Sequence, residues 1–205
     1  MDAIRNAAIP ATLAAALLTV TGCKTPEVQK PLPVVPEIHE PITGLTESQV
    51  NFWNAEKFAA IDGDVAIKID LSDQIALFYK SGELVGRTRV ATGIRGRATP
   101  TGNYRILEKK VKKSSNLWGK IYDAEGNLTI RDADTRKDKV PEGGRYVGAP
   151  MPYWMRFTNT GIGMHAGPIP RPGRPASHGC VRTNRKMVPL FHNHAPLGTP
   201  VKIVE

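Results

Sequence analysis

From residue 63 onward, hydrophobic and polar residues alternate along this 205-residue chain. Val65, Ile67 and Ile69 occupy every second position, which places their side chains on one face of a half-buried strand. Further strands are predicted at residues 74–79, 84–91, 103–108, 153–158, 161–164 and 201–204. Residues 112–148 are charged and rich in turn-forming residues, and predict a long loop. The domain over residues 63–205 should therefore be mainly β, a sandwich or barrel with one or two short helices.

The beginning of the chain predicts export rather than folded structure. Residues 7–20 form an apolar run that is shorter than the roughly 20 residues of a membrane-spanning helix, which is typical of a signal peptide. An aliphatic residue and two small residues stand immediately before Cys23, and this arrangement resembles a lipobox. We therefore expect a lipoprotein signal peptide over residues 1–22, with a lipid attached to Cys23.

Two segments connect this signal to the β domain. Residues 23–45 contain five prolines and predict an extended, semi-rigid linker. Thr46 and Gln49 have the spacing of a capping box, which predicts a helix within residues 46–62 that carries Val50 and Trp53 on its apolar face. A second helix is predicted at residues 184–194, with Thr183 or Asn184 as its cap.

The charge of the chain is concentrated in the β domain. Residues 58–205 contain 24 Lys/Arg and 13 Asp/Glu, whereas residues 1–57 contain 4 and 6. A basic domain could bind nucleic acid, but the export signal and the lack of a recognition motif in the sequence argue against such a partner. Anionic envelope polymers, substrate carboxylates or only a solvated basic surface remain as explanations.

The cysteine count makes Cys180 the residue to explain. The chain has two cysteines, and lipid on Cys23 would leave Cys180 without an intramolecular disulfide partner. Such a thiol is buried and inert, paired with another molecule, or reactive. A reactive thiol needs a base, because a free cysteine is only a few per cent thiolate at neutral pH. His178 lies two residues away, so on a strand the two side chains would share one face, and His165 ends another apolar strand.

The residues around Cys180 suit attack on a carbonyl group. The backbone amides of Gly179 and Cys180 are candidate donors to an oxyanion, and Gly179 leaves room for a substrate. Arg182 is a permanent cation suited to a carboxylate. A zinc site is the chemical rival, because His165, His178, Cys180, His192 and His194 could supply ligands. We expect no metal, since side chains two positions apart on a helix, as in the last pair, diverge.

The order of histidine, spacer, Ser-His-Gly-Cys, aliphatic residue and arginine resembles the signature of the L,D-transpeptidase catalytic domain (YkuD-type) family. Three further segments are similar to this family: residues 65–93, 99–104 and 151–153. The resemblance covers residues 63–205 and implies a β-sandwich of mixed sheets. The sequence departs from the pattern at Thr183, which replaces an apolar residue, and at Asn184, which stands one residue early. These departures leave the role of Asn184 open.

The resemblance implies a two-step acyl transfer on peptidoglycan stem peptides, without a cofactor. Cys180 would attack the carbonyl of the third residue, a diamino acid, release D-alanine and form a thioester. The amine of a second stem would then complete a 3→3 cross-link. Carried over residue by residue, His165 is the general base, His178 assists or orients, and Arg182 binds a substrate carboxylate. Ser177 either fixes the loop by hydrogen bonding or is only a turn residue.

Several alternatives remain open at this level. Water as the acceptor would make the protein an L,D-carboxypeptidase, and a protein lysine would make it an anchoring enzyme. A wall-binding lipoprotein without activity is a further alternative. In each case we expect a monomer in the cell envelope. It should lie in the periplasm and be held to a membrane by its lipid anchor. Lys24 after Cys23 is not the aspartate associated with inner-membrane retention, which favours the outer membrane.

Overall fold

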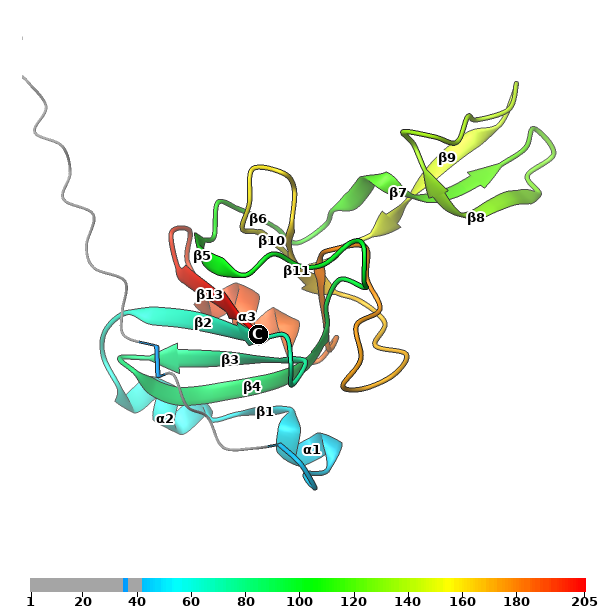
Figure 1. Cartoon of the computed structure of the whole chain (residues 1–205). Helices are drawn as coiled ribbons and strands as arrows, with labels where there is room; N and C mark the ends of the chain where they lie inside the picture. Colours follow the sequence, from blue (N-terminus) through cyan, green and yellow to red (C-terminus); the bar gives the residue numbers. More distant parts are fainter. Residues whose placement is uncertain (1–34, 37–41) are drawn as a thin grey trace, which may run out of the picture. The chain divides into compact units, whose positions relative to one another are not determined.

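The computed structural model describes residues 35–36 and 42–205. The predicted signal peptide, the lipid site at Cys23 and most of the linker lie outside these residues. Within the described part of the chain, no helix is both long and apolar enough to cross a membrane. The elements (Figure 1) are α1 (Glu47–Val50), β1 (Phe52–Trp53), α2 (Ala55–Ala60), β2 (Val65–Asp70), β3 (Ile75–Lys80), β4 (Glu83–Ala91), β5 (Gly102–Arg105), β6 (Glu108–Lys110), β7 (Ser114–Tyr122), β8 (Leu128–Asp134), β9 (Arg145–Pro150), β10 (Trp154–Arg156), β11 (Gly163–Ala166), β12 (Val181–Thr183), α3 (Val188–His194) and β13 (Pro200–Val204).

Ten strands of the described residues form one mixed sheet. Its order is β5-β13-β2-β3-β4-β12-β11-β10-β6, and β1 pairs with β4 beside this path. β13 runs parallel to β2 and β12 parallel to β11, whereas the other neighbours are antiparallel. The long β4 joins the strands on the β3 side of the sheet to those on the β12 side, because it pairs with β3 along its length and with β12 at its end. The prediction of a mainly β fold with mixed sheets is confirmed.

The antiparallel meander of β2, β3 and β4 is buried on both faces rather than on one. Ile67, Ile69 and Phe78 face the main core, in which α3 contributes Phe191. The alternate positions of β3 face a second core that includes Val50 from α1. The segment before residue 63 therefore covers the outer face of the meander, and the prediction of a half-buried strand at Val65, Ile67 and Ile69 is wrong for β2, where five of the six residues are buried.

The single helix predicted for residues 46–62 is also wrong. The capping box at Thr46 is present, but α1 ends after four residues because the chain becomes extended at Asn51. β1 then pairs with β4, placing Trp53 opposite Gly86, where a β-carbon would come within 2.6 Å of the indole. α2 begins at Ala55 and is capped by Asn54, whose side chain accepts a hydrogen bond from the backbone of Lys57 at 2.8 Å. Pairing and burial of Trp53 thus interrupt the helix.

Residues 112–148 do not form the predicted long loop. They contain most of a three-stranded antiparallel sheet in the order β8-β7-β9, which we call the small sheet (Figure 1). β7 pairs with both neighbours but with shifts of register, and many of its side chains are exposed. Irregular pairing and exposure remove the alternation of hydrophobic residues that identifies a strand in a sequence.

Other differences concern element boundaries. The strand predicted at residues 103–108 is divided into β5 and β6, which pair with different strands. α3 begins at Val188 rather than at residue 184, and has a proline in its first turn. Asn184 caps the preceding turn, since its side chain accepts a hydrogen bond from the Lys186 backbone at 2.8 Å.

Trp53 gives a test of the contribution of the leading segment to the core. Its ring lies 5.2 Å from Phe78, 5.3 Å from Phe58 and 5.1 Å from His194, measured between centroids. Trp53→Ala should lower the free energy of unfolding by about 2 kcal/mol, because removing this partly buried ring loses its packing against the main core and leaves a cavity. Urea unfolding followed by circular dichroism measures this loss. An unchanged midpoint would show that the leading segment is not part of the core.

Candidate functional site

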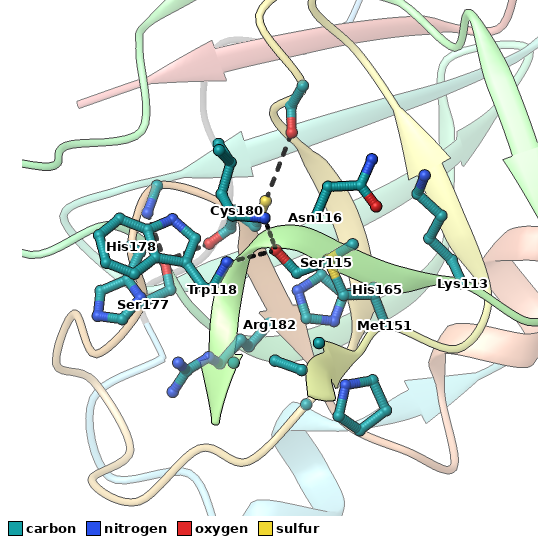
Figure 2. A pocket seen from close by; sticks show the side chains of 18 of the residues that line it. Lys113, Ser115, Asn116, Trp118, Met151, His165, Ser177, His178, Cys180 and Arg182 are labelled. Carbon is teal, nitrogen blue, oxygen red and sulfur yellow. Dashed lines mark hydrogen bonds between the residues drawn. The ribbon is translucent and has the colours of Figure 1, made fainter. Parts of the chain in front are cut away.

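The register of two parallel strands brings the predicted catalytic residues together. In the β11–β12 pair, Met164 lies opposite Val181 and His165 opposite Arg182. Met164 and Val181 are fully buried in the core, so the next residue on each strand faces the other side of the sheet. Cys180 immediately precedes β12 and stands two residues before Arg182, so the two side chains lie on the same side of the chain. His165, Cys180 and Arg182 accordingly line one pocket (Figure 2).

Cys180 is held as a protonated thiol. Its Sγ lies 3.8 Å from the carbonyl oxygen of Gly161, the direction in which a thiol donates. Burial raises the pKa of Cys180, while the backbone N–H of Gly163 and the charge of Arg182 act in the opposite direction. The sulfur therefore becomes a nucleophile only when a base removes its proton.

His165 is a neutral imidazole with a defined tautomer. Its Nδ1 lies 2.9 Å from the Ala166 carbonyl oxygen, which only accepts, so the ring carries its proton on Nδ1. Nε2 is thus left as an acceptor. Burial and, to a smaller extent, the charge of Arg182 lower the pKa of His165 to about 4, against the opposing effect of the bond to Ala166. The ring can take a proton at neutral pH, but it is not already charged.

The loop before Cys180 differs from the expected strand. Ser177 forms an isolated bridge with Gly93, residues 178–180 form a bend, and β12 begins only at Val181, so His178 and Cys180 do not share a strand face. The Gly179 N–H donates to Ser177 Oγ at 3.1 Å. The Ser177 hydroxyl in turn donates to the Cys180 carbonyl oxygen. Ser177 is buried, and both of these bonds are within the loop.

These bonds change the expected role of Gly179. Its N–H is engaged with Ser177, which leaves the Cys180 N–H as the amide of this pair for an oxyanion. The value of a glycine here is conformational: its φ is +120°, and a β-carbon would come within 2.9 Å of Ile162. A side chain at position 179 would strain the backbone and displace Ile162.

His178 is held by the small sheet, which the sequence did not predict. Its ring lies 4.0 Å from the ring of Trp118 of β7 (Figure 2), measured between centroids, and its Nε2 lies 3.1 Å from Asp132 Oδ2 of β8. Burial lowers the pKa of His178, Asp132 opposes this, and the charges of Arg97 and Arg182 add to it. Arg97 also lies over the Trp118 ring at 4.3 Å. An isolated tryptophan within a polar segment was the available signal for Trp118.

Arg182 connects the two catalytic candidates electrostatically. Its aliphatic carbons lie against Gly167, where a β-carbon would come within 2.9 Å of Cγ. Its charge lowers the pKa of both His165 and Cys180. A carboxylate bound to Arg182 would therefore oppose the effect of the Arg182 charge on the pKa values of both groups.

The pocket itself has a volume of about 860 Å³ and lies between the mixed sheet and the small sheet. Its charged lining is mainly basic: Arg97, Lys113, Lys120, Arg131, Arg136, Arg156, Arg182 and Arg185, with Glu108 and Asp132 as the acidic members. Glu108 is engaged with Lys110 and Arg156, which hold its pKa at about 2. The cavity thus suits a ligand that carries carboxylates.

The other two histidines among the described residues lie elsewhere. His194 stacks on Trp53, and His192 is buried against Tyr153 with 5.7 Å between ring centroids. Both belong to the end of α3, and neither lines the pocket. Over residues 35–36 and 42–205, no three His, Cys, Asp or Glu side chains are gathered as metal ligands.

Asp132→Asn tests the contact between the small sheet and the loop of Cys180. Removing the negative charge should lower the pKa of His178 further, because Asp132 is the group that raises it. NMR titration of the His178 ring measures this change. Glu142→Gln removes an exposed carboxylate from the turn before β9 and should leave the titration unchanged. Equal titrations for wild type and Asp132→Asn would contradict the pairing.

Comparison with known proteins adds family and fold to this geometry. The family model of the L,D-transpeptidase catalytic domain (YkuD) matches residues 64–203. Similar solved structures include L,D-transpeptidases from Mycobacterium smegmatis (18% identity, TM-score 0.52, covering 69% of this chain and 59% of that one), Stackebrandtia nassauensis (22%, 0.50, 72% and 60%) and Enterococcus faecium (24%, 0.51, 70% and 50%). The chain thus spans 50–60% of the length of these proteins. No curated protein matches it.

Proposed function

The chain belongs to the L,D-transpeptidase catalytic domain family, and from this premise we propose that it is a cysteine-dependent acyltransferase acting on peptidoglycan stem peptides. The observation that carries the proposal is the shared face of β11 and β12, on which a neutral His165 with a free Nε2 accompanies the Cys180 thiol. A base, a nucleophile and a cationic side chain in one pocket are the groups that acyl transfer requires.

In the first step, His165 Nε2 takes the thiol proton as Cys180 Sγ bonds to the carbonyl carbon of the third stem residue. The Cys180 N–H stabilises the oxyanion. Collapse of the tetrahedral intermediate breaks the amide bond, and His165 returns the proton to the departing D-alanine. Arg182 and the other basic side chains of the pocket hold carboxylates of the stem.

In the second step, the amine of another stem attacks the thioester. His165 takes the proton of the amine, the C–S bond breaks as a 3→3 cross-link forms, and His165 returns the proton to the departing Cys180 thiolate. Water or a protein lysine as the acceptor would use the same intermediate, so acceptor choice does not change the roles of Cys180 and His165.

The products identify both the reaction and the acceptor. Purified protein is mixed with soluble wall fragments that end in tetrapeptide stems, and the products are weighed by mass spectrometry. Free D-alanine with cross-linked dimers supports transpeptidation, whereas tripeptide alone supports carboxypeptidase activity, and fragments attached to an added lysine-bearing protein support anchoring. Wild type that releases no D-alanine from any fragment would reject the proposal.

We also propose that the protein works in the cell envelope. Lipid on Cys23 would hold it to a membrane, and the linker of residues 23–45 would let its β domain reach the wall. The support is the sequence before Cys23 and the prolines that follow it. Mass spectrometry of the N-terminal peptide of the mature protein tests this, with Cys23→Ala as the control. A mature protein that begins at a residue other than Cys23 would reject lipidation.

A further inference from the structure

Thr99 is a buried residue for which the proposed reaction has no use. It is 3% exposed and stands in the turn between β4 and β5. Its Oγ1 donates to the Gly179 carbonyl oxygen at 2.7 Å and accepts a hydrogen bond from the Gly93 N–H at 2.9 Å. Both hydrogen-bonding functions of the hydroxyl therefore join the turn after β4 to the loop of Cys180.

The Gly179 carbonyl belongs to the peptide group that matters for the proposed reaction. The same planar group contains the N–H of Cys180, which is the remaining amide for the oxyanion. A trans peptide is rigid, so a hydrogen bond that fixes the direction of its carbonyl also fixes the direction of its N–H. A donor at the carbonyl oxygen also polarises the group and strengthens the N–H as a donor.

The neighbouring peptide groups are held by a different residue. Ser177 Oγ binds the Gly179 N–H and the Cys180 carbonyl, which lie on either side of the central group. Thr99 holds the carbonyl of the central group itself. Gly179 has a φ of +120°, which glycine adopts without strain, so Thr99 and Ser177 select one conformation of a flexible position.

We propose that Thr99 is a positioning residue that directs the Cys180 N–H toward the oxyanion formed when the thiol attacks a carbonyl. The inference rests on the proposed function in one respect only, that Cys180 attacks a carbonyl carbon. Thr99 touches neither the sulfur nor the substrate, and acts through the Gly179–Cys180 peptide.

Two small reagents separate this role from a general effect on the thiol. With 4-nitrophenyl acetate, the sulfur bonds to the acetyl carbon, an electron pair moves to the carbonyl oxygen, and collapse of the oxyanion expels 4-nitrophenolate. With iodoacetamide, the sulfur displaces iodide, and no oxyanion forms. Loss of oxyanion stabilisation should therefore slow the first reaction and spare the second.

Thr99→Val should slow acetylation of Cys180 roughly 3- to 10-fold, the worth of one hydrogen bond, and change alkylation by less than about twofold. Thr99→Ser keeps the hydroxyl and should restore acetylation. Thr199→Val is the matched control, because Thr199 is also 3% exposed and donates to a carbonyl, that of Pro196, at 2.7 Å. Its ratio of the two rates should equal that of wild type.

Thermal melting of each variant establishes that the rates refer to folded protein. Thr99→Val leaves buried polar groups unpaired, so its Tm should fall, and the assays are run below that Tm. Equal losses of acetylation and alkylation, or undiminished acetylation, would overturn the role of Thr99 alone. A wild-type Cys180 that iodoacetamide labels and the ester does not acetylate would overturn the proposed function as well.

Discussion

Cys180→Ala is expected to reduce D-alanine release from tetrapeptide fragments to the background of the assay, a loss of at least about 1,000-fold. In the proposed mechanism the sulfur forms the covalent bond of the thioester, and neither alanine nor water in its place can form that intermediate. The fold should remain, because Cys180 is only partly buried and stands in the pocket rather than in the core. Mass spectrometry of the products, with a thermal melt of the variant, measures both expectations.

Cys180→Ser is the matched control for this prediction. It keeps the size of the side chain and replaces the thiol by a hydroxyl, which is a much weaker nucleophile when it is not activated. A serine variant that folds but releases no D-alanine would attribute the loss to the sulfur. Cross-linking that continues in either variant would reject Cys180 as the nucleophile.

His165→Gln is expected to slow acyl transfer by about 100- to 10,000-fold at neutral pH, the usual worth of a general base. Glutamine retains a polar group of similar size, but it cannot take the thiol proton. In wild type the rate should fall as pH decreases toward the His165 pKa of about 4, where the imidazole becomes protonated. In the variant the rate should increase with pH, because only ionisation by solvent then supplies the thiolate.

The pH dependence of Cys180 alkylation checks the protonation states behind this prediction. Burial raises the pKa of Cys180, so the thiolate fraction is small at neutral pH and increases with pH. Iodoacetamide should therefore react faster at each step from pH 6 to pH 9. A rate that stays constant down to pH 5 would indicate a thiolate paired with a charged imidazole, and would contradict the neutral pair.

The sequence predicted the parts of the fold and site that depend on local pattern. Alternation identified the meander from Val65, and the motif at residues 177–182 pointed to Cys180 and Arg182 as candidate site residues. It also named His165, whose register with Arg182 follows from two short strands. The pairing of these strands is parallel, and a long connection with no pattern of its own separates them, so sequence alone could not fix their register.

Other parts depend on contacts between distant segments. Trp118 and Asp132 reach His178 from strands whose hydrophobic alternation is lost through irregular pairing and exposure. Thr99 was visible in a motif, but its bond to Gly179 connects residues 80 positions apart. Trp53 fits the apolar face of a helix in the sequence, and only its pocket between Phe58, Phe78 and His194 shows why the helix stops.

The position of β13 has a consequence for the timing of folding. Residues 200–204 lie between β2 and β5, inside the sheet, and run parallel to a strand near the start of the β domain. Contacts of such long sequence separation form slowly, since a large loop must close before they contribute. A ribosome that still holds residues 200–204 would keep β2 and β5 unpaired on that side. Closure of the sheet, and with it the full support of the fold that carries the Cys180 loop, therefore waits until these five residues are released.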